Sequence, residues 1–375
     1  MDQHIEWCDE HLPDLYDEGM FDSEEISEDV WAAVDATAAT TVLDFLEDEE
    51  ERETVADGLT EAARDWFREH HGARIDALVP VDPVALTSKP QVVQHSAEWY
   101  AQRRNRLTAS EFAQILDGRR GSLLRQKLAP VSVIDEVAPA APVAVAQEDG
   151  EMNATRWGHR FEPLVRRIYE LELAGVGTVC DTLGRITHAT VPWLSASPDG
   201  VVLSGPLAGR LVEIKSPKTR APGEFVPFDY YVQMQIQMEV CDLEAADFIE
   251  AQFDQRPEEV APKGAVAAAP WKGRIEVYGH LETPETWVYR YSEPVEDLED
   301  AVLPPPPADL PLLESSVWWL TGWFPRTVLR NQRWWETVGW PAAQLFWSQV
   351  ESRRASASAD SPESAGSVGG WIGSQ

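Results

Sequence analysis

The segment of residues 193–219 constrains the fold most, because its pattern predicts two short strands joined by a turn. Within it, residues 211–215 (LVEIK) alternate between apolar and charged side chains. The alternation places Glu213 and Lys215 on one face of a strand and Val212 and Ile214 on the other face, toward a core. A Pro-Asp-Gly turn precedes the first strand, so the strand pair would bring Asp199 close to the charged face.

Two carboxylates and an ammonium group on one face are costly without a function, since like charges raise each other's energy. Mg²⁺ binds oxygen ligands and retains several waters, so Asp199, Glu213 and the carbonyl of Ile214 would suffice to hold it. Lys215 could then position or help deprotonate a metal-bound water and offset phosphate charge, which suits water attack on a phosphodiester. The alternative is an edge hairpin in which Glu213 and Lys215 form a solvated pair, and spacing alone leaves both interpretations open.

A helix is expected to open at residues 158–162 (GHRFE), with a buried apolar stripe along one face. Glu162 would then lie in the first turn and could supply a further metal ligand. The alternative is that Glu162 only complements the positive end of the helix dipole.

A locally basic stretch, residues 98–127, holds seven basic and three acidic side chains. Thr108 or Ser110 can cap a helix that follows, and a helix N-terminus beside Arg103 is typical of a phosphate site. A capped helix with solvated arginines is the alternative.

Three glutamines, Gln233, Gln235 and Gln237, lie in the segment of residues 228–240 (FDYYVQMQIQMEV). The alternation of apolar and polar residues favours a strand, whereas helical spacing would place Tyr230, Gln233 and Gln237 on one face. The pattern does not decide between the two.

The chain carries 31 basic and 64 acidic side chains, a formal net charge of −33, which argues against a nucleic-acid partner. Residues 1–70, however, hold 24 acidic and only 3 basic side chains. The acidity is therefore mainly an N-terminal property. The acidic region could limit non-specific DNA association, either by competing with DNA for the basic stretch or by repelling duplex. The alternative is that it is a solvated helical appendage.

The three cysteines, Cys8, Cys180 and Cys241, are too few for a four-cysteine zinc or iron–sulfur site and fit a reducing compartment. No apolar run approaches the ~18 residues of a membrane span, and the N-terminus does not have a signal-peptide pattern. We therefore expect an intracellular, soluble protein of the cytoplasm or nucleus of a host cell, without a membrane partner.

Four segments in this order resemble the YqaJ-like viral recombinase and lambda-exonuclease-like branch of the PD-(D/E)xK nuclease superfamily. They are Arg103 with residues 107–110, Gly158 and Glu162 with Tyr169, residues 197–200 with residues 213–215, and Tyr230 with Gln233 and Gln235. The resemblance covers residues 92–254 well and residues 273–350 more loosely. The order and spacing of the four segments together carry the resemblance.

The resemblance implies an α/β fold with a restriction-endonuclease-like core, in which helices flank a mixed central sheet. The acidic helical N-terminal region that precedes this core lies outside the resemblance. It implies that Mg²⁺, or Mn²⁺, is held by Glu162, Asp199, Glu213 and the carbonyl of Ile214. Lys215 would be the catalytic lysine, and Gln233 would lie on a helix that faces the site. The 5′-phosphate of a DNA end would be held by Arg103, Ser110, Ser197 and Gln233, with Gln235 as a further DNA-binding residue.

We therefore expect a metal-dependent deoxyribonuclease, an exonuclease that resects double-stranded DNA ends in viral or phage-type recombination or DNA processing. A single-strand annealing protein and further copies of the chain are candidate partners. The alternative is a non-catalytic module, on the same fold, that binds DNA ends or proteins.

Four regions are expected along the chain. Residues 1–85 form the acidic helical region, and residues 91–255 form the nuclease core with a mobile insertion at 128–152. Residues 256–350 complete the nuclease domain with a hairpin at 273–291 and Trp-rich helices, and residues 351–375 form a disordered tail.

Overall fold

The computed structural model describes residues 7–9, 12, 36, 48–89, 91–94, 96–129, 153–173, 177–220, 226–283 and 286–359. The predicted insertion at 128–152 lies outside the described residues except at its first two positions, as do residues 360–375.

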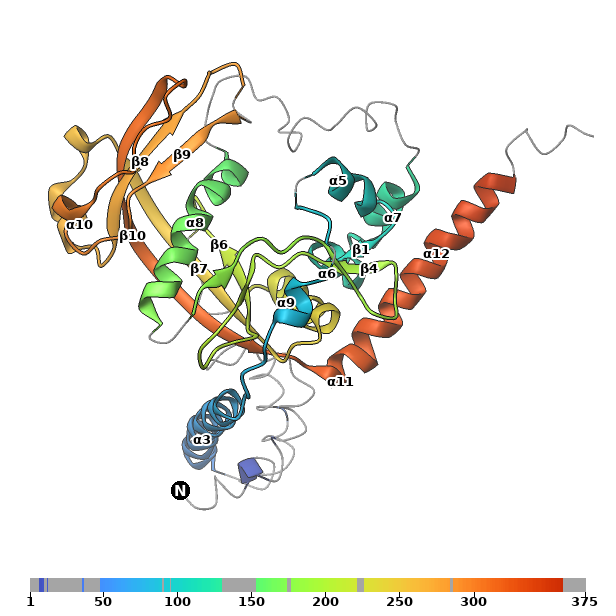
Figure 1. Cartoon of the computed structure of the whole chain (residues 1–375). Helices are drawn as coiled ribbons and strands as arrows, with labels where there is room; N and C mark the ends of the chain where they lie inside the picture. The colour runs from blue at the N-terminus through green and yellow to red at the C-terminus, as the bar shows by residue number, and fades with distance from the viewer. Residues whose placement is uncertain are drawn as a thin grey trace, which may run out of the picture.

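A seven-stranded mixed sheet forms the centre of the molecule (Figure 1). In spatial order its strands are β2 (Val179–Cys180), β5 (Gly200–Val202), β6 (Leu211–Lys215), β7 (Ala245–Arg256), β10 (Leu312–Leu329), β8 (Lys272–Tyr278) and β9 (Val288–Tyr291). The β6–β7 pair is parallel and the other pairs are antiparallel. The predicted mixed sheet is therefore confirmed, as are the β5–β6 strand pair and the β8–β9 hairpin.

Helices cover both faces of this sheet. On one face α8 (Ala154–Glu172) packs its apolar stripe against Val212 and Ile214 of β6. On the other face α6 (Ala109–Leu116) and α9 (Phe228–Cys241) share a core with Leu211 and Phe248. Because strand side chains alternate, Glu213 and Lys215 follow Leu211 onto the face covered by α9.

A small second sheet, in the order β1 (Leu107–Thr108), β4 (Leu194–Ala196) and β3 (Ile186–Thr187), lies beside α6. In it Thr108 is paired with Ser195. This pairing brings the start of α6 next to the chain that leads to Ser197 and Asp199. It therefore connects the basic stretch to the acidic segment of the site.

The remaining helices lie at the edges of this core. They are α3 (Glu49–Asp76), α4 (Val84–Thr87), α5 (Ala97–Arg103), α7 (Arg120–Leu128), α10 (Lys263–Ala268), α11 (Gln332–Trp334) and α12 (Trp340–Ala359). In α3, which lies in the region predicted to be helical, the side chains of Leu59, Ala63, Trp66 and Phe67 are buried. No helix in the described ranges is long and apolar enough to cross a membrane.

Two predicted helical features differ in the structure. The helix α8 begins at Ala154, because Asn153 caps it by accepting a hydrogen bond from the Arg156 amide at 2.9 Å. Glu162 therefore lies well inside the helix rather than in its first turn. A role restricted to the helix dipole is wrong for this residue, since that effect fades within the first turn.

The predicted Trp-rich helices are only partly correct. Trp318, Trp319 and Trp323 lie on β10, which pairs with β7 along most of its length and also with β8. Aromatic and β-branched residues suit a pleated, half-buried surface, and this pairing decides for a strand. Arg326 also lies on β10.

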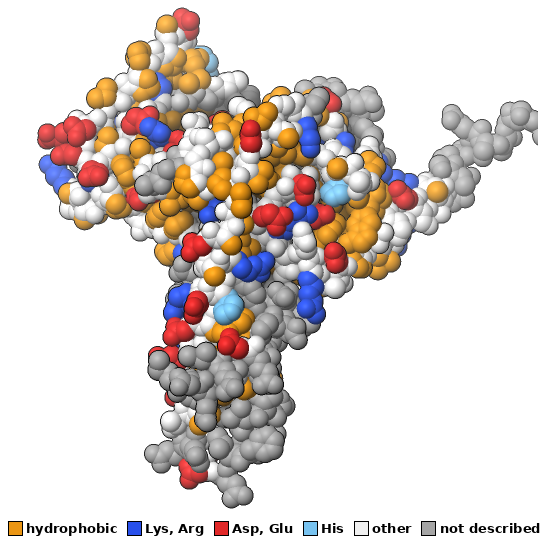
Figure 2. Space-filling model, turned by 60° about the horizontal axis from the view of Figure 1, so that its bottom comes forward, with side chains coloured by type: hydrophobic (Ala, Val, Ile, Leu, Met, Phe, Trp, Pro, Cys, Tyr) orange, Lys and Arg blue, Asp and Glu red, His pale blue; other side chains and the backbone are white. Residues whose placement is uncertain are grey.

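The disordered tail predicted from residue 351 is wrong for its first part, because α12 continues to Ala359. Arg354 of this helix donates to the carbonyl oxygens of Arg104 at 3.0 Å and Lys127 at 2.8 Å. These bonds attach α12 to the basic stretch. In the view of Figure 2, acidic and basic side chains are interspersed over the described surface.

Candidate active site

Glu213 is the central acidic residue of the site. Its side chain is 0% exposed, and both carboxylate oxygens accept hydrogen bonds. Oε1 accepts from Gln233 Nε2 at 2.7 Å and from Lys215 Nζ, and Oε2 accepts from Gln237 Nε2 at 2.7 Å. The strand β6 and the helix α9 therefore fix the position of this carboxylate together.

Asp199 lies at the start of β5 and turns toward β6. Its Oδ2 accepts a hydrogen bond from the Ile214 amide at 2.8 Å, which holds the carboxylate beside the same strand. Burial raises the pKa of Asp199 well above its usual value, and repulsion from Glu213 adds to the rise. The predicted approach of Asp199 to Glu213 and Lys215 is thus confirmed by the geometry.

Lys215 carries the positive charge of this group. Burial opposes that charge, but attraction to Glu213 and Asp199 outweighs burial and raises the pKa of Lys215 above its usual value. The Nζ atom also lies 4.9 Å from the centre of the Tyr230 ring. Lys215 is therefore protonated at neutral pH, which favours offsetting phosphate charge over accepting a proton.

Glu162 reaches the same cavity from α8. Burial raises its pKa, attraction to His159 and Lys215 opposes the rise, and Glu213 adds to it. In the described part of the chain, no three His, Cys, Asp or Glu side chains are arranged to hold a metal ion. Lys215 and two amide groups occupy the oxygens of Glu213 through hydrogen bonds.

The donor set nevertheless suits a divalent cation. Glu162 and Asp199 line one cavity, and Glu213 is hydrogen-bonded to Lys215, Gln233 and Gln237 of the cavity wall. Burial together with repulsion from Glu213 disfavours the charged forms of Asp199 and Glu162. A hard cation that prefers oxygen ligands would relieve this repulsion.

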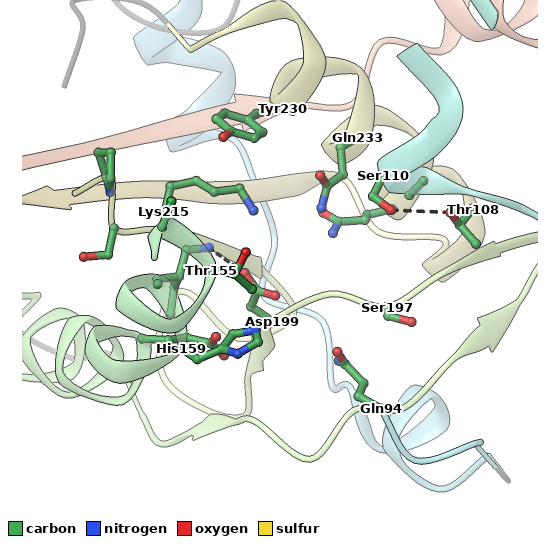
Figure 3. Close-up of a pocket in the computed structure, with 18 of the residues that line it drawn as sticks. Gln94, Thr108, Ser110, Thr155, His159, Ser197, Asp199, Lys215, Tyr230 and Gln233 are labelled. Carbon is green, nitrogen blue, oxygen red and sulfur yellow. Dashed lines mark hydrogen bonds between the residues drawn. The ribbon is translucent and has the colours of Figure 1, made fainter. Parts of the chain in front are cut away.

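Glu162, Asp199 and Lys215 line one end of a cavity of about 480 Å³ (Figure 3). Figure 3 shows Lys215, Asp199 and His159 at one end, and Ser110, Ser197 and Gln94 toward the other. Arg103 and Gln233 also line the cavity. The structure therefore brings together all predicted phosphate-binding residues except Gln235.

The expected DNA-binding role of Gln235 is wrong. Its side chain is buried, donates to the Leu329 carbonyl at 2.8 Å and accepts from the Asn331 amide at 2.8 Å. It therefore joins α9 to the end of β10, away from the cavity. Residues four apart share a helix face whereas residues two apart do not, so Gln237 rather than Gln235 accompanies Gln233.

Several cavity residues were not predicted from the sequence. They are Gln94, Trp99, Thr155, His159, Arg185, Gln237, Lys218 and Arg220. Thr155 and His159 precede Glu162 at helical spacing on α8, so a correct helix start would have indicated both. Arg185 precedes β3 and has no such signal, because the pairing of β3 with β4 depends on the whole fold.

A mixed sheet flanked by helices, with an acid–acid–lysine group in a cavity, is the arrangement expected of a PD-(D/E)xK nuclease domain. Residues 98–244 match the family model of the YqaJ-like viral recombinase domain, which confirms the resemblance predicted from the sequence. All residues of the acid–lysine group lie within the matched range.

The individual proteins that the chain resembles are distant in sequence. The chain is 24% identical over 206 residues to an uncharacterized protein, R354, of Acanthamoeba polyphaga mimivirus, and the alignment covers 51% of this chain but only 34% of that protein. The fold is similar to an alkaline exonuclease from Laribacter hongkongensis (18% identity, TM-score 0.39, 70% of this chain and 99% of that one). It is also similar to a phage related exonuclease from Haemophilus somnus 129PT (11% identity, TM-score 0.34, 66% and 96%). Scores of this size do not by themselves establish a common fold.

Proposed function

We propose that this chain is a divalent-metal-dependent nuclease that hydrolyses phosphodiester bonds at the ends of duplex DNA, in viral or phage-type recombination or DNA processing. The convergence of Asp199 and Lys215 at one end of a single cavity, with Glu213 hydrogen-bonded to Lys215, carries this proposal. Hydroxyl groups and Arg103 at the other end suit a phosphate. The family match supports the same class of reaction.

A bound Mg²⁺ or Mn²⁺ ion would be held by Asp199, Glu213, Glu162 and the carbonyl of Ile214. When bound, it would stabilise negative charge on the phosphate and lower the pKa of a coordinated water.

The side chains of the chain itself provide the remaining functions. Lys215, protonated at neutral pH, offsets charge that develops on the phosphate oxygens. Gln233 and Gln237 fix the orientation of the Glu213 carboxylate through their amide groups. They act as positioning residues. If Glu213 binds an ion, at least one of these two hydrogen bonds to its carboxylate must be given up.

The 5′-phosphate of a strand end is the proposed ligand at the far end of the cavity. Arg103 supplies charge there, and Ser110 and Ser197 supply hydroxyl donors. The Ser197 hydroxyl accepts a hydrogen bond from Trp99 Nε1 at 3.1 Å, so its own hydrogen is available to an oxygen ligand. Duplexes with 5′-phosphorylated ends are therefore expected to be degraded faster than those with 5′-hydroxyl ends.

An Asp199→Asn variant tests the proposal, because asparagine keeps the size of the side chain and can still accept from the Ile214 amide. We expect normal folding by circular dichroism and loss of Mg²⁺-dependent cleavage of end-labelled linear duplex. Asp247→Asn is the matched control, since Asp247 is a buried aspartate that contacts Tyr169 and Thr327 outside the cavity.

Digestion of linear, nicked and circular DNA in parallel distinguishes exonuclease from endonuclease action. Cleavage by Asp199→Asn at the wild-type rate would refute the catalytic assignment. A wild-type chain that binds duplex ends but does not cleave with Mg²⁺ or Mn²⁺ would instead be a non-catalytic end-binding module.

A further inference from the structure

A group of charged side chains beside the hydroxyl end of the cavity, most of them buried, contains more positive than negative members. Its single carboxylate, Glu111, is 2% exposed, and its cations are Arg103, Lys127 and Arg185. Glu111 Oε1 accepts from Arg103 Nε at 2.9 Å, and Oε2 accepts from Lys127 Nζ at 2.7 Å and Thr108 Oγ1 at 2.7 Å. Both oxygens are thus engaged without reaching Arg185.

Arg185 forms no ion pair among the described residues, although attraction to Glu111 acts on it from a longer distance. It is 4% exposed, and its Nη2 donates to the Trp99 carbonyl at 3.0 Å, whereas Nε and Nη1 are buried without a hydrogen-bond partner in the described part of the chain. The guanidinium lies 4.5 Å from the centre of the Trp99 ring. Burial, and then repulsion from Arg103, lower the pKa of Arg185 to about 10.

A buried guanidinium with unpaired N–H groups is costly, and such groups in native proteins call for an explanation. Arg185 lines the same cavity as Arg103, Ser110 and Ser197. An anion in this part of the cavity would be attracted by both guanidinium groups, since opposite charges within about 4–6 Å interact strongly where water is excluded.

We propose that Arg185 is a phosphate-binding residue that holds, together with Arg103, the doubly charged phosphate monoester at the end of a nucleic-acid strand. Positive charge is in excess in this cluster, since Arg103, Lys127 and Arg185, with Arg106 nearby, face one carboxylate. A phosphate monoester carries about −1.5 to −2 at neutral pH, whereas an internal phosphodiester carries a single charge. The charge balance therefore favours a strand end over the interior of a strand. The inference rests on the proposed nuclease function for the identity of the substrate, but not for the presence of the anion site.

Thermal unfolding of the full chain in inorganic phosphate tests the site without requiring activity. The melting temperature is compared with that in sodium chloride of equal ionic strength, so that screening is the same in both. Ligands that bind the native state raise the melting temperature, so we expect phosphate to stabilise the wild-type chain. We expect Arg185→Gln to lose this shift, and Arg185→Lys, which keeps the charge without the guanidinium fork, to retain only part of it.

Arg290→Gln is the matched control. Arg290 is 9% exposed and lies 5.3 Å from the Tyr278 ring, as Arg185 lies against Trp99, but it pairs with Glu276 and is remote from the cavity. In chloride, Arg290→Gln should lower the melting temperature because it leaves Glu276 without a cationic partner. Arg185→Gln should leave it unchanged or raise it, because it removes an uncompensated buried charge. The phosphate shift should persist in Arg290→Gln.

Two results would overturn the proposal: a wild-type chain that phosphate does not stabilise beyond chloride, or an Arg185→Gln variant that keeps the full shift. If Arg185→Gln does not fold, Arg185→Lys decides, and an undiminished shift in that variant is equally contrary. Failure of the nuclease function is distinguishable from these results. It would appear as absent metal-dependent cleavage in a wild-type chain that phosphate still stabilises.

Discussion

Replacement of Lys127 by methionine tests the charge cluster that supports the phosphate end of the cavity. Lys127 Nζ donates to Glu111 Oε2 at 2.7 Å and to the Arg103 carbonyl at 2.8 Å, and the Lys127 and Glu111 side chains are each 2% exposed. Methionine fills a similar volume but removes the charge and both hydrogen bonds.

Removal of one partner from a buried ion pair costs about 3–5 kcal/mol, because the other charge remains buried and unpaired. Here Arg103 still donates to Glu111 Oε1, and its side chain is 37% exposed, so it compensates only in part. We therefore expect Lys127→Met to lower the free energy of unfolding by about 3 kcal/mol, the lower end of that range.

Urea denaturation at pH 7 measures this free energy. The double variant Glu111→Leu with Lys127→Met should lose much less than the sum of the two single variants, since replacing both charges of a buried pair by apolar groups is often neutral. A loss of about 1 kcal/mol should remain, because Glu111 also completes the capping box at Thr108. Lys263→Met, at an exposed position on α10, is the control and should stay within about 0.5 kcal/mol of wild type.

The reasoning is refuted if Lys127→Met costs less than about 1 kcal/mol, or if the losses of the two single variants add in the double variant. Additive losses would mean that the pair contributes packing rather than charge.

Three further predictions follow from particular contacts. Burial opposes the charge of Glu111, but attraction to Lys127 and Arg103 outweighs burial and holds its pKa below the usual value. The stabilising contribution of Glu111 is therefore present above the unfolded pKa of about 4.3 and is lost as the pH falls through the lowered pKa. Urea denaturation should show that the difference in unfolding free energy between wild type and Glu111→Gln shrinks below about pH 4. Mn²⁺ or Mg²⁺ should raise the melting temperature of wild type but not of Asp199→Asn, and a chelator should abolish cleavage; equal metal shifts in both proteins would exclude Asp199 as a ligand. A chain of residues 77–359 should keep cleavage in a digestion assay, because the described cavity is lined by residues 94–237. Truncation at residue 350 should lower the melting temperature measured by calorimetry, because it removes the contacts of Arg354.

Local patterns predicted those parts of the site that lie on neighbouring elements. The alternation at residues 211–215 was sufficient to place Glu213 and Lys215 on one face, and the turn before Gly200 was sufficient to bring Asp199 beside them. The alternation in residues 228–240 favoured a strand, and only the resemblance indicated the helix α9 that the structure contains. A helix can alternate in this way when it is buried on most sides, as α9 is, because apolar residues then need not follow a single face.

Contacts between distant segments could not be predicted in the same way. Nothing local distinguishes Lys127 from the other basic residues of its stretch, yet its side chain is buried against a carboxylate on another helix. Arg185 and Gln235 are similar cases. The pairing of β3 with β4 determines the position of Arg185, and the end of β10 determines the hydrogen-bond partners of Gln235.

The burial of these cations also bears on the acidic N-terminal region. Several basic side chains of residues 98–127 are directed toward the protein itself: Lys127 and Arg103 contact Glu111, Arg119 pairs with Asp117 and Asp229, and Arg106 donates to the Pro192 carbonyl. An acidic segment that competes with DNA for this stretch would therefore find fewer surface charges than the sequence suggests. Repulsion of duplex at a distance needs no such contact and depends on ionic strength. If it operates, removal of residues 1–76 should strengthen DNA binding at low salt and have little effect near 0.5 M salt, where the Debye length is about 4 Å; equal affinities at low salt would leave the solvated-appendage interpretation.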